Sequence, residues 1–157
     1  MAIDREQLKT LIDATLSRMD LHSPAAVNLL MGTAAQESHL GTYIRQIGGG
    51  PARGIFQMEP ATERDLWANY LRGRMHLSDR VWVVSGCDGP NPYQLEGNLL
   101  YQIAIARIHY LRVPKPLPAA GDVAAMAAYW KKYWNTHLGD GTVEEFAANY
   151  REYVEAA

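Results

Sequence analysis

The segment of residues 99–111 constrains the fold of this chain more than any other stretch. At helical spacing its apolar residues cover most of the circumference; they are Leu99, Leu100, Ile103, Ile105, Ala106, Ile108 and Leu111. A helix that is apolar on most sides has to be surrounded by other elements, so this segment predicts a buried central helix. Three prolines between residues 114 and 118 end it and form a stiff connector.

Amphipathic segments on both sides of this helix predict further helices. Apolar stripes preceded by capping residues mark residues 4–20, 24–40, 122–138 and 142–154, and shorter helical segments follow Pro60 and Ser78. The run of residues 86–97 is rich in glycine and proline and predicts a loop. We expect a mainly α chain with six or seven helices. Residues 1–157 are enough for one core, and no linker or repeat interrupts them, so a single domain is predicted.

The helix predicted for residues 24–40 carries Glu37 in its last turn. Ser23 and Pro24 suit its N-cap and first turn, and Gly41 suits its end. The negative end of the helix dipole and the nearby apolar side chains both disfavour a carboxylate at Glu37. A carboxyl so placed keeps its proton near neutral pH and suits a general acid, although a solvated glutamate in a last turn is also common.

A glycine-rich connection follows this helix. Residues 43–47 and 54–59 are short segments separated by three glycines and a proline, so they predict a small β-hairpin with a flexible flap. Because side chains alternate along a strand, Gln57 and Glu59 would share one face, which we expect to lie opposite Glu37. Such a polar cluster is costly to assemble without a function.

These residues resemble a known signature. Glu37-Ser38, the glycine-rich spacer and Gly54-Ile55-Phe56-Gln57-x-x-Pro60-x-Thr62 are similar to the Glu-Ser and Gly-Leu-Met-Gln-x-x-Pro-x-Thr elements of soluble lytic transglycosylases and goose-type lysozymes. Farther on, Asn98 and Ala127-Ala128-Tyr129 resemble downstream elements of that group, in the same order. Three features depart from its pattern: Phe56 stands where the group has Met, Trp130 stands where it has Asn, and the spacer is unusually rich in glycine.

The resemblance implies an α+β lysozyme-like fold in which the hairpin lies beside the active-site cleft. It also implies that Glu37 is the catalytic acid and base, with Ser38 and Gln57 at the sugar site and Tyr129 supporting Glu37.

The aromatic residues of the chain suit a saccharide groove. Nine tyrosines and four tryptophans stand against two phenylalanines. Rings with a polar edge can stack on pyranose rings and also form hydrogen bonds. We assign Trp67, Trp82 and Trp134 to the core, and Tyr43 and Tyr129 to the groove.

The predicted activity is cleavage of the β-1,4 bond between N-acetylmuramic acid and N-acetylglucosamine in peptidoglycan. If the sugar's own C6 hydroxyl attacks, the product is an anhydro-muropeptide and Glu37 suffices. If water attacks, a second carboxylate is needed, and Glu59 is the one on the hairpin. Residues 38–58 contain no Asp or Glu, which favours a lytic transglycosylase over a hydrolytic muramidase. A non-catalytic wall-binding virion protein is a further alternative, although Glu37 and Gln57 are both retained.

Composition narrows the range of partners. A net charge of -2 gives no reason to expect nucleic acid as a partner, and the single cysteine, Cys87, excludes an intramolecular disulfide. No metal or cofactor is expected, because the histidines lack ligand spacing; they are His22, His39, His76, His109 and His137. We expect a monomer that binds peptidoglycan glycan strands.

The first 25 residues mix charges with apolar residues and contain no signal-peptide core, and no apolar run reaches the length of a membrane span. We therefore expect synthesis in the cytoplasm, no membrane insertion, and action on periplasmic peptidoglycan. Phage release, virion delivery and a dedicated secretion route all fit, so an endolysin, a virion-associated enzyme and a bacterial effector stay open.

Overall fold

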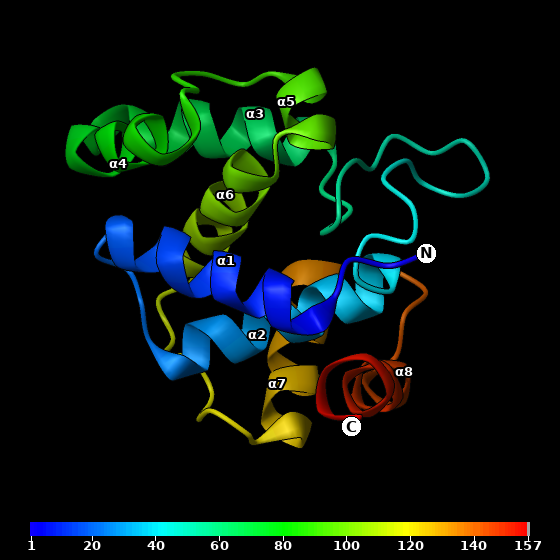
Figure 1. The fold of residues 1–157 in the computed structure, drawn as a ribbon. Helices are drawn as coiled ribbons and strands as arrows, with labels where there is room; N and C mark the ends of the chain where they lie inside the picture. The colour runs from blue at the N-terminus through cyan, green and yellow to red at the C-terminus, as the bar shows by residue number, and fades with distance from the viewer. Residues whose placement is uncertain (157) are drawn as a thin grey trace.

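The computed structural model describes residues 1–156, and this part of the chain is mainly helical (Figure 1). Its α-helices are α1 (Arg5–Arg18), α2 (Pro24–Ser38), α3 (Pro60–Asn69), α4 (Met75–Ser85), α5 (Pro92–Gly97), α6 (Leu99–Leu111), α7 (Val123–Trp130) and α8 (Val143–Asn149). A 3-10 turn, η1 (Leu71–Gly73), joins α3 to α4, and π-helical turns, η2 (Lys131–Asn135) and η3 (Tyr150–Glu155), follow α7 and α8. The mainly α prediction is confirmed, with eight α-helices among the described residues instead of six or seven.

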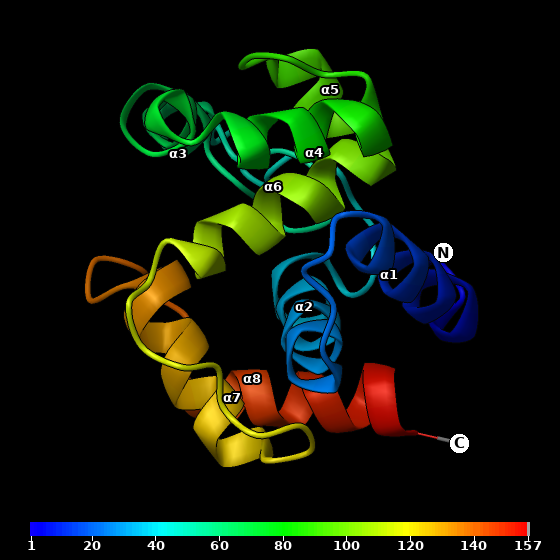
Figure 2. The ribbon, with the colours of Figure 1, turned by 90° about the vertical axis from the view of Figure 1, so that its left-hand side faces the viewer.

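Helix α6 is the central element, as predicted. It is buried without interruption from Tyr101 to Ile108. Figure 2 shows α3, α4 and α5 gathered on one side of it and α1, α2, α7 and α8 on the other. Two polar residues are buried with it, Gln102 and Arg107, and the Arg107 guanidinium donates to the carbonyl of Leu21 at 3.0 Å. The apolar circumference of this segment therefore holds the two groups of helices together.

Helix α5 lies within residues 86–97, where the sequence predicts a loop, so that prediction is wrong for the second half of the run. Asn91 caps α5 by accepting from the N–H groups of Tyr93 and Gln94, and Pro92 occupies its first turn. Asn and Pro are common in turns, but they are equally favoured at a helix N-terminus. The Asn-Pro pair is itself favoured in turns, so these residue types do not distinguish the two cases.

Residues 43–59 form an irregular loop, and a two-stranded hairpin is not confirmed. Arg45 pairs with Arg53, and Arg53 with Met58, as isolated antiparallel bridges. Within residues 1–156, no strand longer than a single bridged residue is formed. Gly54 and Gln57 have φ angles of 79° and 50°, which turn the chain between the bridged residues and end the pairing. The prediction that Gln57 and Glu59 share one face of a strand therefore has no basis here, because Gln57 does not lie in a strand.

None of the helices in the described part of the chain combines the length and the apolar character that crossing a bilayer requires.

Candidate active site

A cleft of about 1000 Å³ opens among the end of α2, the 43–59 loop, the start of α3 and the segment that follows α7. This volume lies at the upper end of the range of ~300–1,000 Å³ typical of ligand pockets. Of the residues that the sequence assigns to the site, four line the cleft; they are Glu37, Tyr43, Gln57 and Glu59. The cleft thus brings the predicted acid together with three of its predicted neighbours.

Glu37 lies in the last turn of α2, on the wall of the cleft. The helix begins at the Ser23 cap as predicted, but it ends at Ser38, because His39 adopts the left-handed conformation before Gly41 is reached. Burial raises the pKa of the Glu37 carboxyl from 4.5 to about 7, and a hydrogen bond from an indole N–H partly opposes the rise. This carboxyl therefore exchanges its proton near neutral pH.

Trp130, the last residue of α7, provides that indole. Its Nε1 donates to Glu37 Oε1 at 2.9 Å. The ring is fully buried and packs on Phe146 with 5.4 Å between ring centroids, and a Cβ at Gly141 would lie 2.7 Å from it. Packing on two sides fixes the ring, so its N–H is aimed at the carboxyl before any ligand binds. In the sequence, Trp130 could have been singled out because it stands where the resembled group has Asn, another side chain that carries an N–H.

Tyr129 does not line the cleft. Its hydroxyl donates to the carbonyl of Lys115 at 3.1 Å, and its ring is buried. The support for Glu37 that the resemblance implies for Tyr129 comes from its neighbour Trp130 in this structure. Tyr43, by contrast, lies in the cleft and donates its hydroxyl to the backbone carbonyl of Glu37 at 2.8 Å.

Ser38 is fully buried and is not among the residues that line the cleft. Its Oγ donates to the carbonyl of Ile55 at 2.6 Å and accepts from the N–H of Gly41 at 2.8 Å. The bond to Ile55 fastens the end of α2 to the 43–59 loop. Ser38 therefore positions the two walls of the cleft and is not placed to bind a ligand.

Helix α6 holds the same loop from the other side. The Gln102 side chain accepts from the N–H of Ile55 at 2.7 Å. Gln57 lies in the cleft, where its Nε2 donates to the carbonyl of Gly54 at 2.9 Å. The loop that carries Gln57 is thus anchored to the buried core.

We expect Gly54→Ala to destabilise the protein by at least about 2 kcal/mol. Gly54 has a φ of 79°, and a Cβ there would lie 2.4 Å from both Gln102 Oε1 and the backbone oxygen of Leu95. Urea denaturation measures the loss. Gly48→Ala is the matched control, because Gly48 has a φ of 90° but nothing lies within 4 Å of its Cβ. Equal losses in the two variants would show that the contact with α5 and α6 is unimportant.

Two other titratable groups in the cleft have lowered pKa values, whereas the pKa of Glu37 is raised. Asp65 accepts from Asn69 at 2.7 Å and from Arg112 at 2.6 Å, and these hydrogen bonds lower the pKa of its carboxyl. Burial lowers the pKa of the His109 ring to about 4, so this ring is neutral at pH 7. Asp65 is therefore ionised at neutral pH, in contrast to Glu37.

Besides the exposed Asp65, two further exposed carboxylates line the cleft, Glu59 and Asp140. Sequence reasoning found Glu59 and missed Asp140, because Asp140 follows α7 and reaches the cleft only through the fold. Across residues 1–156 no three side chains of the metal-binding types lie together.

Comparison of the chain with protein-family models, with curated proteins and with solved structures found no match. Its function is therefore inferred from the residues of the cleft.

Proposed function

We propose that this protein is a peptidoglycan-cleaving glycosidase of lysozyme-like fold, with Glu37 as its acid and base. The observation that carries the proposal is a carboxyl with a pKa of about 7 on the wall of a large cleft. A group with this pKa can both give and accept a proton at neutral pH, which is what cleavage of a glycosidic bond requires of one residue acting twice.

In the first step Glu37 gives its proton to the oxygen that links N-acetylmuramic acid to N-acetylglucosamine, and the bond from the muramic C1 to that oxygen breaks. Positive charge develops on the muramic ring, where the acetamido group of the sugar assists. Glu37 is now ionised. The Trp130 N–H, 2.9 Å from its Oε1, stabilises the carboxylate at this stage.

In the second step the C6 hydroxyl of the muramic ring attacks C1 and gives its proton to Glu37. The products are a chain end carrying a 1,6-anhydro ring and a chain beginning with N-acetylglucosamine. The carboxyl is restored, and no water is consumed. This one-carboxylate route is supported by the absence of Asp and Glu from residues 38–58, and the Asp65 carboxylate is engaged by Asn69 and Arg112.

The proposed setting is periplasmic peptidoglycan, reached by phage release, virion delivery or a dedicated secretion route, with a monomer acting on glycan strands. The sequence signature supports it, together with the placement of Glu37 at a helix end beside the loop that carries Gln57.

A hydrolytic muramidase is the second candidate, and Glu59 favours it. This residue stands at the N-cap position of α3, yet its side chain makes no capping hydrogen bond, and it is exposed in the cleft. An inverting reaction needs a carboxylate about 6.5–9.5 Å from the acid, with room for a water between them. In this second reaction Glu59 would be the base that activates the water.

We expect Glu59→Gln to lower the rate of peptidoglycan cleavage by less than about tenfold, because a carboxylate outside the reaction contributes only electrostatically. Mass spectrometry of the digest distinguishes the two reactions, since anhydro products are lighter than muramidase products by one water. Asp140→Asn is the matched control, because it removes the charge of another exposed carboxylate in the cleft. Reducing ends in the wild-type digest, with activity lost in Glu59→Gln alone, would show that water is the acceptor and Glu59 the base.

A further inference from the structure

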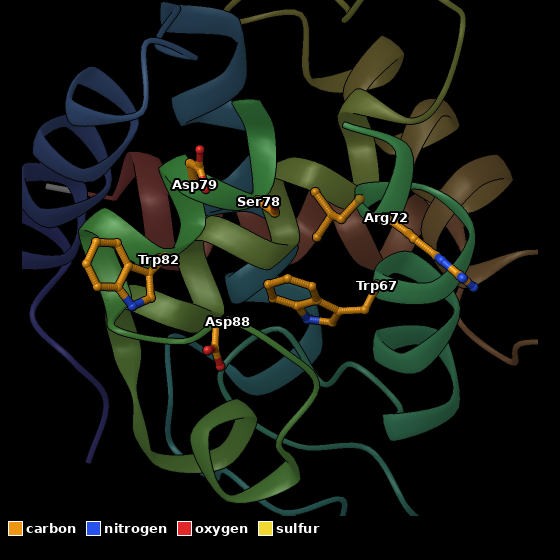
Figure 3. A pocket seen from close by; sticks show the side chains of 7 residues that line it. Trp67, Arg72, Ser78, Asp79, Trp82 and Asp88 are labelled. Atoms are coloured by element: carbon orange, nitrogen blue, oxygen red, sulfur yellow. The ribbon is translucent and has the colours of Figure 1, made fainter. Parts of the chain in front are cut away.

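A second pocket, of about 490 Å³, lies among α3, η1, α4 and the loop after α4 (Figure 3). It shares no lining residue with the cleft that contains Glu37. Its volume falls within the range of ~300–1,000 Å³ typical of ligand pockets. The side chains that matter below are Trp67, Arg72, Ser78, Asp79, Trp82 and Asp88.

Two indole rings border this pocket. Trp82 on α4 is 57% exposed, although the sequence assigns it to the core, and Trp67 on α3 is half-buried. In Figure 3 the two rings lie on two sides of an open space, with Asp88 at its edge. Tryptophan is among the more buried residue types on average. Two indoles that border one pocket form the kind of aromatic lining that is typical of ligand sites.

A buried hydrogen-bond network joins the α3 wall of the pocket to the wall formed by the loop after α4. Trp67 Nε1 donates to the Tyr101 hydroxyl at 2.9 Å, and this hydroxyl donates to Glu63 Oε2 at 2.5 Å. The N–H of Asn91 donates to the same carboxylate oxygen at 3.0 Å. Glu63 is fully buried, and Asn91 lies in the loop that carries Asp88. One carboxylate therefore ties the α3 wall to the loop wall, so these two walls are fixed relative to each other before a ligand arrives.

The polar groups of the pocket select the class of ligand. Asp79 and Asp88 oppose a phosphate or a nucleic acid, whereas the Arg72 guanidinium opposes an ammonium ion. A neutral ligand rich in hydroxyls uses both kinds of group, since carboxylates accept from hydroxyls and Arg72 donates to them. The Ser78 hydroxyl donates to the carbonyl of Met75 at 3.1 Å and can accept from the ligand. The indole faces can stack on the apolar faces of pyranose rings.

We propose that this pocket is a second, non-catalytic binding site for a short neutral oligosaccharide. The site goes beyond the proposed glycosidase activity and does not depend on it. If both sites bind one glycan network, the pocket raises the effective concentration of substrate at the cleft.

The tryptophans allow the two sites to be observed separately. Of the four in the chain, Trp67 and Trp82 line the pocket, and Trp130 and Trp134 line the cleft. We would titrate the ¹⁵N-labelled Glu37→Gln protein, which is expected not to cleave sugar, with the trimer of N-acetylglucosamine, and follow the indole N–H signals by NMR. The Trp67 and Trp82 signals are expected to shift and saturate. Shifts of the Trp130 and Trp134 signals report only on binding in the cleft.

Trp82→Ala is expected to weaken the binding reported by the Trp67 signal about tenfold, since stacking on one aromatic ring contributes roughly that factor. Val83→Ala is the matched control, because Val83 is the next residue of α4, is 56% exposed and does not line the pocket. It should leave the binding unchanged. Asp88→Asn, which keeps the size of a pocket side chain, should weaken it.

Three results would overturn the proposal. The first is that the trimer leaves the Trp67 and Trp82 signals in place, whatever the cleft signals do. The second is that choline or inorganic phosphate shifts these signals and the trimer does not, which would assign the pocket to an ion. The third is that Val83→Ala weakens the binding as much as Trp82→Ala. Failure of the glycosidase proposal shows itself elsewhere, as absence of cleavage by the unmodified protein.

Discussion

Replacing Glu37 with glutamine should abolish cleavage of peptidoglycan and leave the fold intact. An amide cannot give a proton to the glycosidic oxygen or take one from the attacking hydroxyl, so the rate should fall by at least about 100-fold. The change conserves the size of the side chain. The amide oxygen can still accept from Trp130 Nε1, which now donates to Glu37 Oε1 at 2.9 Å. Clearing of outer-membrane-stripped Gram-negative cells measures the rate, and circular dichroism reports on the fold.

Asp140→Asn is the control for this experiment, because it also changes a carboxylate of the cleft to an amide, at a residue with no role in either proposed reaction. A folded Glu37→Gln protein that clears cells at the wild-type rate would exclude Glu37 as the acid. If the unmodified protein binds cell walls but never cleaves them, the virion-protein alternative replaces the enzyme.

Local signals in the sequence were enough to place Glu37. The position of a residue in a helix depends on the cap and on apolar spacing within a few residues, and the Ser23 cap is present. The capping box of Thr142 and Glu145 at the start of α8 forms with both of its hydrogen bonds for the same reason. The central position of α6 follows from its apolar circumference. The helical frame and the last-turn placement of the acid were thus predictable.

The partners of Glu37 were not predictable, because they are distant in sequence. Trp130 reaches the carboxyl across 93 residues, and only the packing of α7 against α2 and α8 brings it there. The irregular loop was missed for a different reason. Gln57 has a φ of 50°, an unusual conformation for a residue with a side chain, and residue type alone gives no sign of it. Ser38 was assigned to the substrate from the motif, whereas its hydroxyl is used inside the fold.

The pH dependence of stability should depend strongly on Glu37. Its pKa is about 7 in the folded protein and 4.5 in its ordinary state, so the folded protein binds the proton more tightly. The stability from this difference is fully present below about pH 4.5 and is lost as the pH rises through about 7. Glu37→Gln has no proton to lose. The stability of the variant relative to wild type should therefore rise by on the order of 2–3 kcal/mol between about pH 5 and about pH 8.5.

Urea denaturation of both proteins across this range measures the change, and every other titratable group is common to the pair. Trp130→Phe provides a second comparison. It keeps an aromatic ring against Phe146 but removes the N–H that stabilises the carboxylate. The pKa of Glu37 should then rise further, so that this variant loses more stability than wild type between the same two pH values. If the difference in unfolding free energy between wild type and Glu37→Gln does not change with pH, burial does not raise the pKa of Glu37. Glu37 would then be ionised at neutral pH and could not act as the acid.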